Sequence, residues 1–182
     1  VSIAGVPERI VSLSPSNTEI LFALGLGDRV VGVTKYCNYP SQVKELESSG
    51  KIEVVGGYVD PDIEAILSLR PDLVLAGQKH SNGAVPLLDK ENIPVFVVDS
   101  NNLDNIILSI KKVGQITGKD ENASNLADQM ESRMKDISDR ISSLAKTRVL
   151  YIVWHDPVKT AGLGTFENEI IEKAGGVNIF HD

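Results

Sequence analysis

The sequence has a single cysteine, few aromatic residues and no long apolar run. Because Cys37 has no second cysteine to pair with, no internal disulfide forms and cysteine usage does not indicate a redox compartment. The net charge is −7 and no basic stripe is present, which argues against nucleic acid as the main partner. No apolar stretch approaches the roughly 20 residues of a membrane span. No signal peptide is recognisable from Val1 onward, and a leader removed before that residue stays open.

Common catalytic and nucleotide-binding motifs are also missing. The sequence contains no G-x-G-x-x-G or G-x-x-x-x-G-K-[ST] phosphate loop after a strand, no G-x-S-x-G elbow and no H-E-x-x-H. The spacing of His80, His155 and His181 matches no compact metal motif, so we expect exposed loop histidines and no metal site. Cys37 has no evident histidine partner, which argues against a catalytic thiol.

The composition, with 42% apolar and 24% charged residues, is that of a globular protein. The stretch from Glu8 to Val33 predicts a strand over 10–13, a turn at Ser14-Pro15-Ser16, a helix and a second strand over 30–33. Ser16 as N-cap and Glu19 three residues later form a capping-box pattern. The turn follows the carboxyl end of the first strand, where open α/β sheets place their ligands.

The same alternation continues to residue 98. Strands are predicted over 52–55, 73–76 and 95–98, and helices over 42–46, 61–69 and 85–90. Asp60 and Pro61 predict the start of the second of these helices, as N-cap and first helical residue. Repeated β-α units predict a mostly parallel sheet covered by helices, which we assign to an N-terminal lobe over 1–101.

The pattern changes after Ser100. Apolar residues recur at helical spacing over 103–113 and again over Asp120 to Leu144, a long helix that suits a strut across the molecule. We assign 102–146 to a helical connector and 147–182 to the start of a second lobe. There a strand over 149–153, a loop over 155–164 and a helix over 167–174 are expected. One such unit cannot bury both faces of its strand, so we expect a truncated chain or a partner chain that completes the sheet, with a dimer as one possibility.

Four of the nine aromatic residues stand apart from the core pattern. Tyr36, Tyr39 and Tyr58 fall in loops at strand ends, and Trp154 closes a strand of the second lobe. Rings at the rim of a sheet can stack on a planar ligand, although they can equally hold their own loops on the lobe. Glu64, in the first turn of its helix, has as its simplest role a favourable contact with the helix dipole.

Several segments together resemble one family. These are VSLSPSNTEILFALGLGDRVVGV, KYCNYP, IEAILSLRPDLVLAG and TAGLGTFENEIIEKAGGVNIF, in colinear order over nearly the whole chain. They are similar to the substrate-binding proteins of ABC importers for vitamin B12, within the wider group that captures ferric siderophores and haem. The resemblance implies an α/β fold with two Rossmann-like lobes joined by a long rigid helix, with little hinge closure on binding. By this resemblance the second lobe of the present chain is incomplete.

The resemblance also implies roles for individual residues. Pro15 and its turn, with Ser16, would line the N-lobe side of the cleft. Tyr36, in the KYCNYP segment that also holds Tyr39, matches a tyrosine that contacts cobalamin, and Tyr58 falls where an aromatic packs on the corrin. Trp154 or its neighbours would begin the C-lobe face.

Glu64 matches a glutamate that docks on arginines of the membrane permease. The chain departs from the family after the strand LVLAG. There it continues with Gln78, Lys79 and His80, where the family tends to have an aromatic residue.

These inferences favour an extracytoplasmic protein that captures a corrinoid and delivers it to an ABC importer permease. It would catalyse nothing, need no cofactor and meet the membrane only through the permease or a removed lipid anchor. A ferric siderophore or haem is the alternative ligand within the same class. The alternatives of other classes are an α/β enzyme that uses the Ser14-Pro15-Ser16 helix N-terminus as an anion site, and a structural oligomer.

Overall fold

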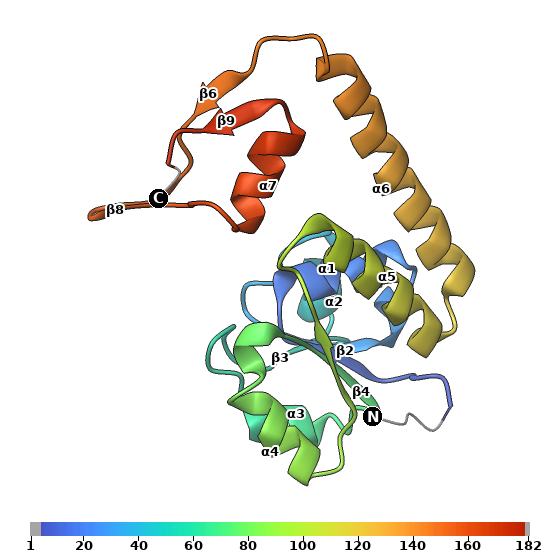
Figure 1. Ribbon diagram of the computed structural model, residues 1–182. Helices are drawn as coiled ribbons and strands as arrows, with labels where there is room; N and C mark the ends of the chain where they lie inside the picture. The colour runs from blue at the N-terminus through green and yellow to red at the C-terminus, as the bar shows by residue number, and fades with distance from the viewer. Residues whose placement is uncertain (1–4, 181–182) are drawn as a thin grey trace.

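The computed structural model describes residues 5–180 and is built on one parallel sheet (Figure 1). Its five strands lie in the order β3-β2-β1-β4-β5, and every neighbouring pair is parallel. His181 lies outside the described residues. The strands, all near their predicted positions, are β1 (Ile10–Ser12), β2 (Val30–Val33), β3 (Glu53–Val54), β4 (Leu73–Gly77) and β5 (Val95–Val98).

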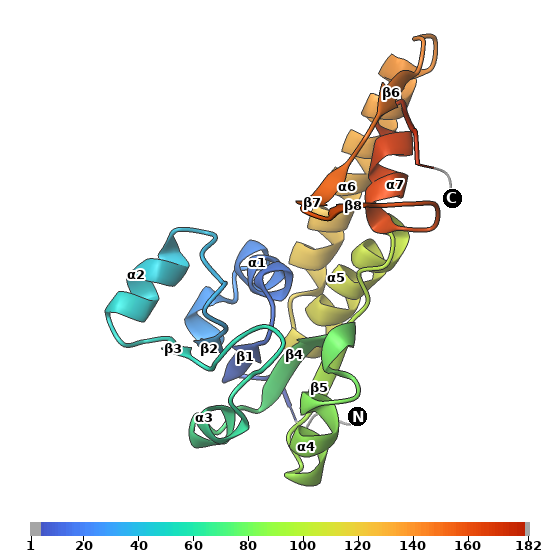
Figure 2. The ribbon, with the colours of Figure 1, turned by 90° about the vertical axis from the view of Figure 1, so that its left-hand side faces the viewer.

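Helices cover both faces of this sheet, as the sequence predicts (Figure 2). Successive strand residues point to opposite faces, so Ile10 joins one apolar cluster and its neighbour Val11 joins the other. Burying a side chain of this size contributes about 1.5–3 kcal/mol. The first cluster includes residues of α1 (Pro15–Ala23), α2 (Gln42–Ser48) and α5 (Leu103–Thr117), and the second includes residues of α3 (Ile63–Ser68) and α4 (Ala84–Lys90).

The order of the strands reverses beside β1. The chain first adds β2 and β3 on one side of β1 and then crosses to add β4 and β5 on the other side. Ile10 therefore pairs with both Val30 and Leu73. In open parallel sheets, ligands bind outside the carboxyl ends of the strands at such a reversal, which here is the edge that carries the Ser14-Pro15 turn.

The predicted capping box at the start of α1 is wrong. The N-cap is Ser14, whose backbone is extended and whose Oγ accepts a hydrogen bond from Asn17 N at 3.3 Å. Pro15 takes the first helical position, which suits its fixed φ and missing N–H. Because the cap lies two residues before the predicted one, Ser16 is already helical and Glu19 is not placed to cap the N-terminus.

The start of α3 also differs from the prediction. Its N-cap is Asp62, whose Oδ1 accepts from Ala65 N at 3.0 Å, and not Asp60. Gly56 and Pro61 instead pair as an isolated antiparallel bridge. Residues 56–61 therefore form a closed loop before the helix begins.

Two helices connect the sheet to the rest of the chain. The helix α5 packs on the first cluster through Ile110 and Val113, and the long helix α6 (Asp120–Ile141) confirms the predicted strut (Figure 1). A side chain at Gly114 would meet Ala123 and the Lys119 carbonyl oxygen, so glycine allows the close approach of the two helices. None of the helices in residues 5–180 is long and apolar enough to cross a membrane.

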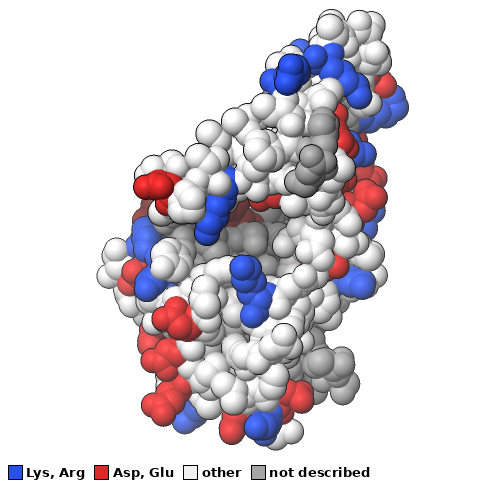
Figure 3. Space-filling model, turned by 60° about the vertical axis from the view of Figure 1, so that its left-hand side comes forward, with Lys and Arg blue, Asp and Glu red and all other residues white. Residues whose placement is uncertain are grey.

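The chain after α6, which we call the second unit (residues 147–180), forms two small sheets. One pairs β6 (Thr147–Val149) with β9 (Gly176–Asn178) in parallel beside α7 (Phe166–Lys173). The predicted single strand over 149–153 is wrong, because the chain leaves β6 after Val149. A hairpin of β7 (Ile152–His155) and β8 (Val158–Thr160) replaces the predicted loop. Figure 3 shows a recess between the second unit and the lobe that holds the five-stranded sheet.

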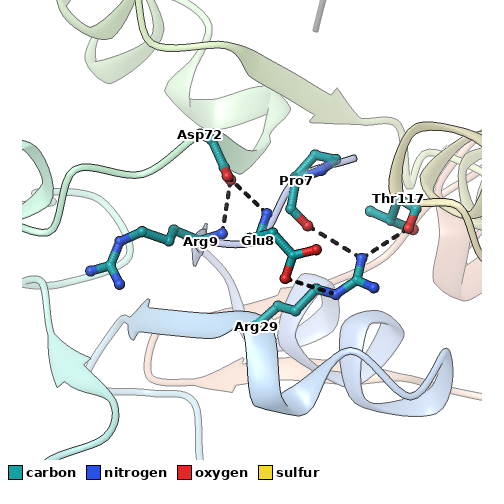
Figure 4. Close-up of polar contacts among 6 residues, drawn as sticks. All are labelled: Pro7, Glu8, Arg9, Arg29, Asp72 and Thr117. Atoms are coloured by element: carbon teal, nitrogen blue, oxygen red, sulfur yellow. Dashed lines mark hydrogen bonds and ion pairs between the residues drawn. The ribbon is translucent and has the colours of Figure 1, made fainter. Parts of the chain in front are cut away.

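Polar contacts close the opposite, amino edge of the sheet (Figure 4). The Asp72 carboxylate accepts from the backbone N of Glu8 at 2.8 Å and of Arg9 at 2.9 Å. Arg29 Nη1 donates to the carbonyl oxygens of Pro7 at 3.2 Å and Thr117 at 3.0 Å. These bonds join the segment before β1 to the end of α5, so they stabilise the fold at the edge away from the Ser14-Pro15 turn.

Candidate ligand-binding site

A hollow of about 650 Å³ lies at the carboxyl edge of the five-stranded sheet. The loops that follow β1, β2 and β3 all contribute to its wall. It brings together four of the ligand-binding residues predicted from the sequence, and adds Ser14, Glu19 and Val59. The lining residues are Ser14, Pro15, Ser16, Glu19, Tyr36, Tyr58 and Val59.

A buried cysteine fixes the loop that carries Tyr36. Cys37 is fully buried, and its Sγ lies 3.2 Å from Thr18 Oγ1 of α1 and 3.3 Å from Thr34 Oγ1. The next residue back, Tyr36, is 54% exposed and lines the hollow, with Lys35 Nζ 5.2 Å from its ring centroid. Cys37 therefore anchors the loop that presents the tyrosine, a role that the sequence alone does not reveal.

The loop that carries Tyr58 rests on a histidine. His80 is only 2% exposed, and its Nε2 lies 2.7 Å from the Tyr58 carbonyl oxygen. Its Nδ1 accepts a hydrogen bond from Gly77 N at 2.9 Å. The expectation of an exposed histidine at position 80 is therefore wrong, because backbone groups at the end of β4 and in the loop after β3 satisfy both ring nitrogens in the interior.

A second, smaller hollow of about 200 Å³ adjoins the first, and the two share Ser14, Ser16 and Tyr58. It extends the carboxyl edge over the ends of β4 and β5, with Lys79 and Ser100 in its wall. Its hydroxyl, amide and ammonium groups suit the polar periphery of a ligand whose flat part occupies the larger hollow.

Tyr39 and Trp154 are not among the residues that line either hollow. Tyr39 is 65% exposed on the loop after β2. Trp154 is 54% exposed on β7, its Nε1 donates to the Asp156 carbonyl oxygen at 2.8 Å, and its ring lies beside His155. A contact of either ring with a ligand stays a prediction.

Glu64 lies away from the hollows, exposed in the first turn of α3. Among the residues that sequence reasoning missed, Glu19 had a usable signal, because it lies four residues after Pro15 and so shares a face of α1 with it. Val59 is 80% exposed. Its position next to Tyr58 in the sequence was the signal that could have placed it in the site.

Two curated relatives align with almost the whole chain. An uncharacterised ABC transporter substrate-binding lipoprotein, YvrC of Bacillus subtilis (strain 168), is 38% identical over 94% of this chain and 55% of its own length. The vitamin B12-binding protein of Yersinia pestis (strain Pestoides F) is 35% identical over 98% of this chain and 62% of its own length. The chain thus spans less than two thirds of the length of these relatives.

Two solved structures of the same fold are named for different ligands. The periplasmic vitamin B12 binding protein BtuF of Vibrio cholerae matches with a TM-score of 0.82 and 32% identity, over 97% of this chain and 67% of that one. The periplasmic heme-binding protein RhuT of Roseiflexus sp. RS-1 matches with a TM-score of 0.80 and 31% identity, over 96% and 66%.

The model of the periplasmic binding protein family matches residues 10–182. These relatives are named as solute-binding proteins and not as enzymes, so the alternative of an α/β enzyme is not supported. The chain belongs to the periplasmic binding protein family.

Proposed function

We propose that this protein captures a corrinoid outside the cytoplasm and delivers it to the permease of an ABC importer. The observation that carries the proposal is the convergence of Pro15, Tyr36 and Tyr58 on one hollow, from the start of α1 and the loops after β2 and β3. The likeness to vitamin B12-binding proteins, at 35% and 32% identity, supports the class of ligand. The lipoprotein and periplasmic names of the relatives support the location.

The residues that line the hollow suit a bulky, flat ligand. Its volume of about 650 Å³ lies within the range of small-molecule sites. Tyr36 and Tyr58 supply aromatic surface, and Pro15 and Val59 add apolar surface that needs no hydrogen-bond partner. Each well-placed ring contributes about 0.5–1.5 kcal/mol beyond its buried area.

Haem is the second candidate. The heme-binding protein RhuT has the same fold, and its sequence identity to this chain, 31%, is close to the 32% of BtuF. A haem iron needs an axial ligand from the protein. His80 is not available for that role, since both its ring nitrogens face backbone groups in the interior. The tyrosine hydroxyls of the hollow would have to serve instead.

A ferric siderophore is the remaining alternative within the class. An anionic siderophore favours basic residues around its site. Glu19 is the charged residue in the wall of the larger hollow, and Lys79 lies in the wall of the smaller one. This balance supports a ligand without strong negative charge, as the corrinoid proposal requires.

We also propose that Glu64 contributes to docking on the permease. It is exposed, lies in the first turn of α3, and is not among the residues that line the two hollows. A carboxylate in that place is free to meet a cationic side chain of a partner without disturbing the ligand.

The second unit offers a surface for a dimer, which we retain as a proposal. Its β7 strand is exposed along its whole length, with Ile152, Val153 and Trp154 each more than half exposed. Association through this apolar strand predicts a dimer in sedimentation velocity that Val153→Lys converts to a monomer. A monomer in the unsubstituted protein would contradict it.

Co-elution on gel filtration tests the ligand. The protein is mixed separately with cyanocobalamin, hemin and a ferric hydroxamate, and visible absorbance is followed across the protein peak. The corrinoid proposal predicts that cyanocobalamin alone elutes with the protein. If hemin or the hydroxamate elutes with the protein instead, the ligand is haem or a ferric siderophore and not a corrinoid. If none of the three elutes with the protein, a binding role for this chain is refuted.

A further inference from the structure

His80 lies behind the wall of the hollow and contacts the residue that forms that wall. The histidine is 2% exposed, whereas Tyr58 lines both hollows. The two residues are 22 apart in sequence and come from the loops after β4 and β3. Nothing in the proposed function uses this buried ring.

The hydrogen bonds of His80 determine its tautomer. Nε2 lies 2.7 Å from the Tyr58 carbonyl oxygen, which can only accept, so Nε2 carries a proton. Nδ1 lies 2.9 Å from Gly77 N and 3.1 Å from the Gly77 carbonyl oxygen. In the neutral ring Nδ1 is then the acceptor, and the backbone N–H of Gly77 donates to it. Both nitrogens are used, and the ring joins the end of β4 to the backbone of Tyr58.

The side chains of the two residues also contact each other. Their ring centroids are 5.3 Å apart and the planes meet at 85°, an edge-to-face arrangement. A Cβ added at Gly77 would lie 3.7 Å from both Tyr58 Oη and His80 Nδ1. The tyrosine hydroxyl and the histidine ring therefore flank the same glycine, which places the Tyr58 ring over the end of β4.

The ends of the 56–61 loop are held without His80. Lys35 N donates to the Gly56 carbonyl oxygen at 3.0 Å, and Asp62 N donates to that of Val55 at 3.0 Å. The contacts of His80 with Tyr58 itself are additional to these. Removal of the histidine contact is therefore expected to free the tyrosine while the loop stays closed.

We propose that His80 is a positioning residue for ligand binding: it holds both the backbone and the ring of Tyr58 in the place where the ligand packs. The inference rests on the proposed function, because it assigns Tyr58 to the ligand. A ring fixed before binding loses less conformational freedom when the ligand arrives, which raises affinity without adding a contact.

Two substitutions separate the role of each ring nitrogen. In His80→Asn the amide oxygen can still accept from Gly77 N, but the side chain is too short to reach the Tyr58 carbonyl oxygen. In His80→Gln the longer side chain brings an amide N–H to the position of Nε2 and restores the bond to Tyr58. The proposal predicts that Asn weakens cyanocobalamin binding about three- to tenfold. Gln, which restores the bond to the Tyr58 backbone but not the ring contact, should recover part of that loss.

The same substitution in a Tyr58→Ala background separates positioning from general destabilisation. If His80 acts through Tyr58, His80→Asn adds no further loss of cyanocobalamin affinity in that background. An equal loss in both backgrounds, or no loss in either, would overturn the proposal.

Amide hydrogen exchange supplies a readout that needs no ligand. His80→Asn is expected to speed amide exchange at residues 57–59 of the loop and to leave exchange in the five-stranded sheet as in wild type. His80→Gln should restore the protection of the loop amides. If wild type binds neither cyanocobalamin nor hemin, the proposed function fails and exchange alone decides. Unchanged exchange at 57–59 in His80→Asn would then refute the hold on Tyr58.

Discussion

Thr18 Oγ1 lies 3.2 Å from Cys37 Sγ, and this contact joins α1 to the loop after β2. The same hydroxyl also contacts Ser12 Oγ at 2.8 Å, so it links the end of β1, the first helix and the Tyr36 loop. The two walls of the hollow that carry Pro15 and Tyr36 are thereby fixed to one another inside the core.

Cys37→Ala removes the sulfur between Thr18 and Thr34 and leaves a small cavity. We expect the free energy of unfolding to fall by about 1–2 kcal/mol in urea denaturation, and cyanocobalamin affinity to fall with it because Tyr36 loses its anchor. Affinity equal to wild type alongside the lost stability would show that the loop is held elsewhere.

The burial of Cys37 makes a further check possible. A thiol that is fully buried is expected to react with a thiol reagent only after denaturant is added. Reaction in the native protein at the rate of a free thiol would contradict the position of this residue.

Tyr36→Ala and Tyr39→Ala form a matched pair, because both rings are more than half exposed and both lie after β2. We expect Tyr36→Ala to weaken cyanocobalamin binding by about 0.5–1.5 kcal/mol in a titration followed by visible absorbance. Tyr39→Ala should weaken it less, since Tyr39 does not line either hollow. The reverse ranking would place the ligand over Tyr39, which the sequence pattern alone also allows.

Glu64→Arg reverses the charge at the proposed docking position. We expect cyanocobalamin affinity to stay at the wild-type value and transport by reconstituted importer to fall. The substitution also opposes the dipole at the start of α3, at a cost of about 0.3–1 kcal/mol in stability. Glu45→Arg, on α2 across the sheet, is the control and should transport normally. Equal uptake with both variants would remove Glu64 from the docking surface.

Ser14→Ala and Ser16→Ala distinguish the two assignments of the α1 cap. The structure predicts a loss of about 1 kcal/mol in the free energy of unfolding for Ser14→Ala, which removes the acceptor for Asn17 N. Ser16→Ala should be nearly neutral because Ser16 is already helical. A larger loss of stability for Ser16→Ala than for Ser14→Ala would contradict this assignment and support Ser16 as the N-cap, as the sequence pattern predicts.

Much of the fold follows from local patterns that the sequence displays. Alternating apolar strands and helical stripes predicted all five strands of the sheet and the long helix over residues 120–141. The start of α3 was misplaced because Asp60 and Pro61 have the composition of a cap. In the structure Pro61 instead pairs with Gly56, and Asp62 caps the helix.

The site was predictable only in part, because some of its residues are positioned by contacts between segments far apart in the sequence. Loops at the carboxyl ends of parallel strands meet at one edge, so the sequence alone is enough to group Pro15, Tyr36 and Tyr58. His80 could not be placed, because its burial depends on a carbonyl group 22 residues away. The prediction of one strand over 149–153 was wrong, because this segment is divided between β6 and β7. The turn at Asp156-Pro157 lets β7 pair with β8 as a hairpin.

Isothermal titration with cyanocobalamin, run side by side on the wild-type protein and the Tyr36→Ala, Tyr58→Ala double variant, tests the central claim most directly. The account predicts saturable binding of one ligand per chain in wild type and a clearly weaker affinity in the double variant. Equal binding by the two proteins, or heat of dilution alone in both, would contradict it.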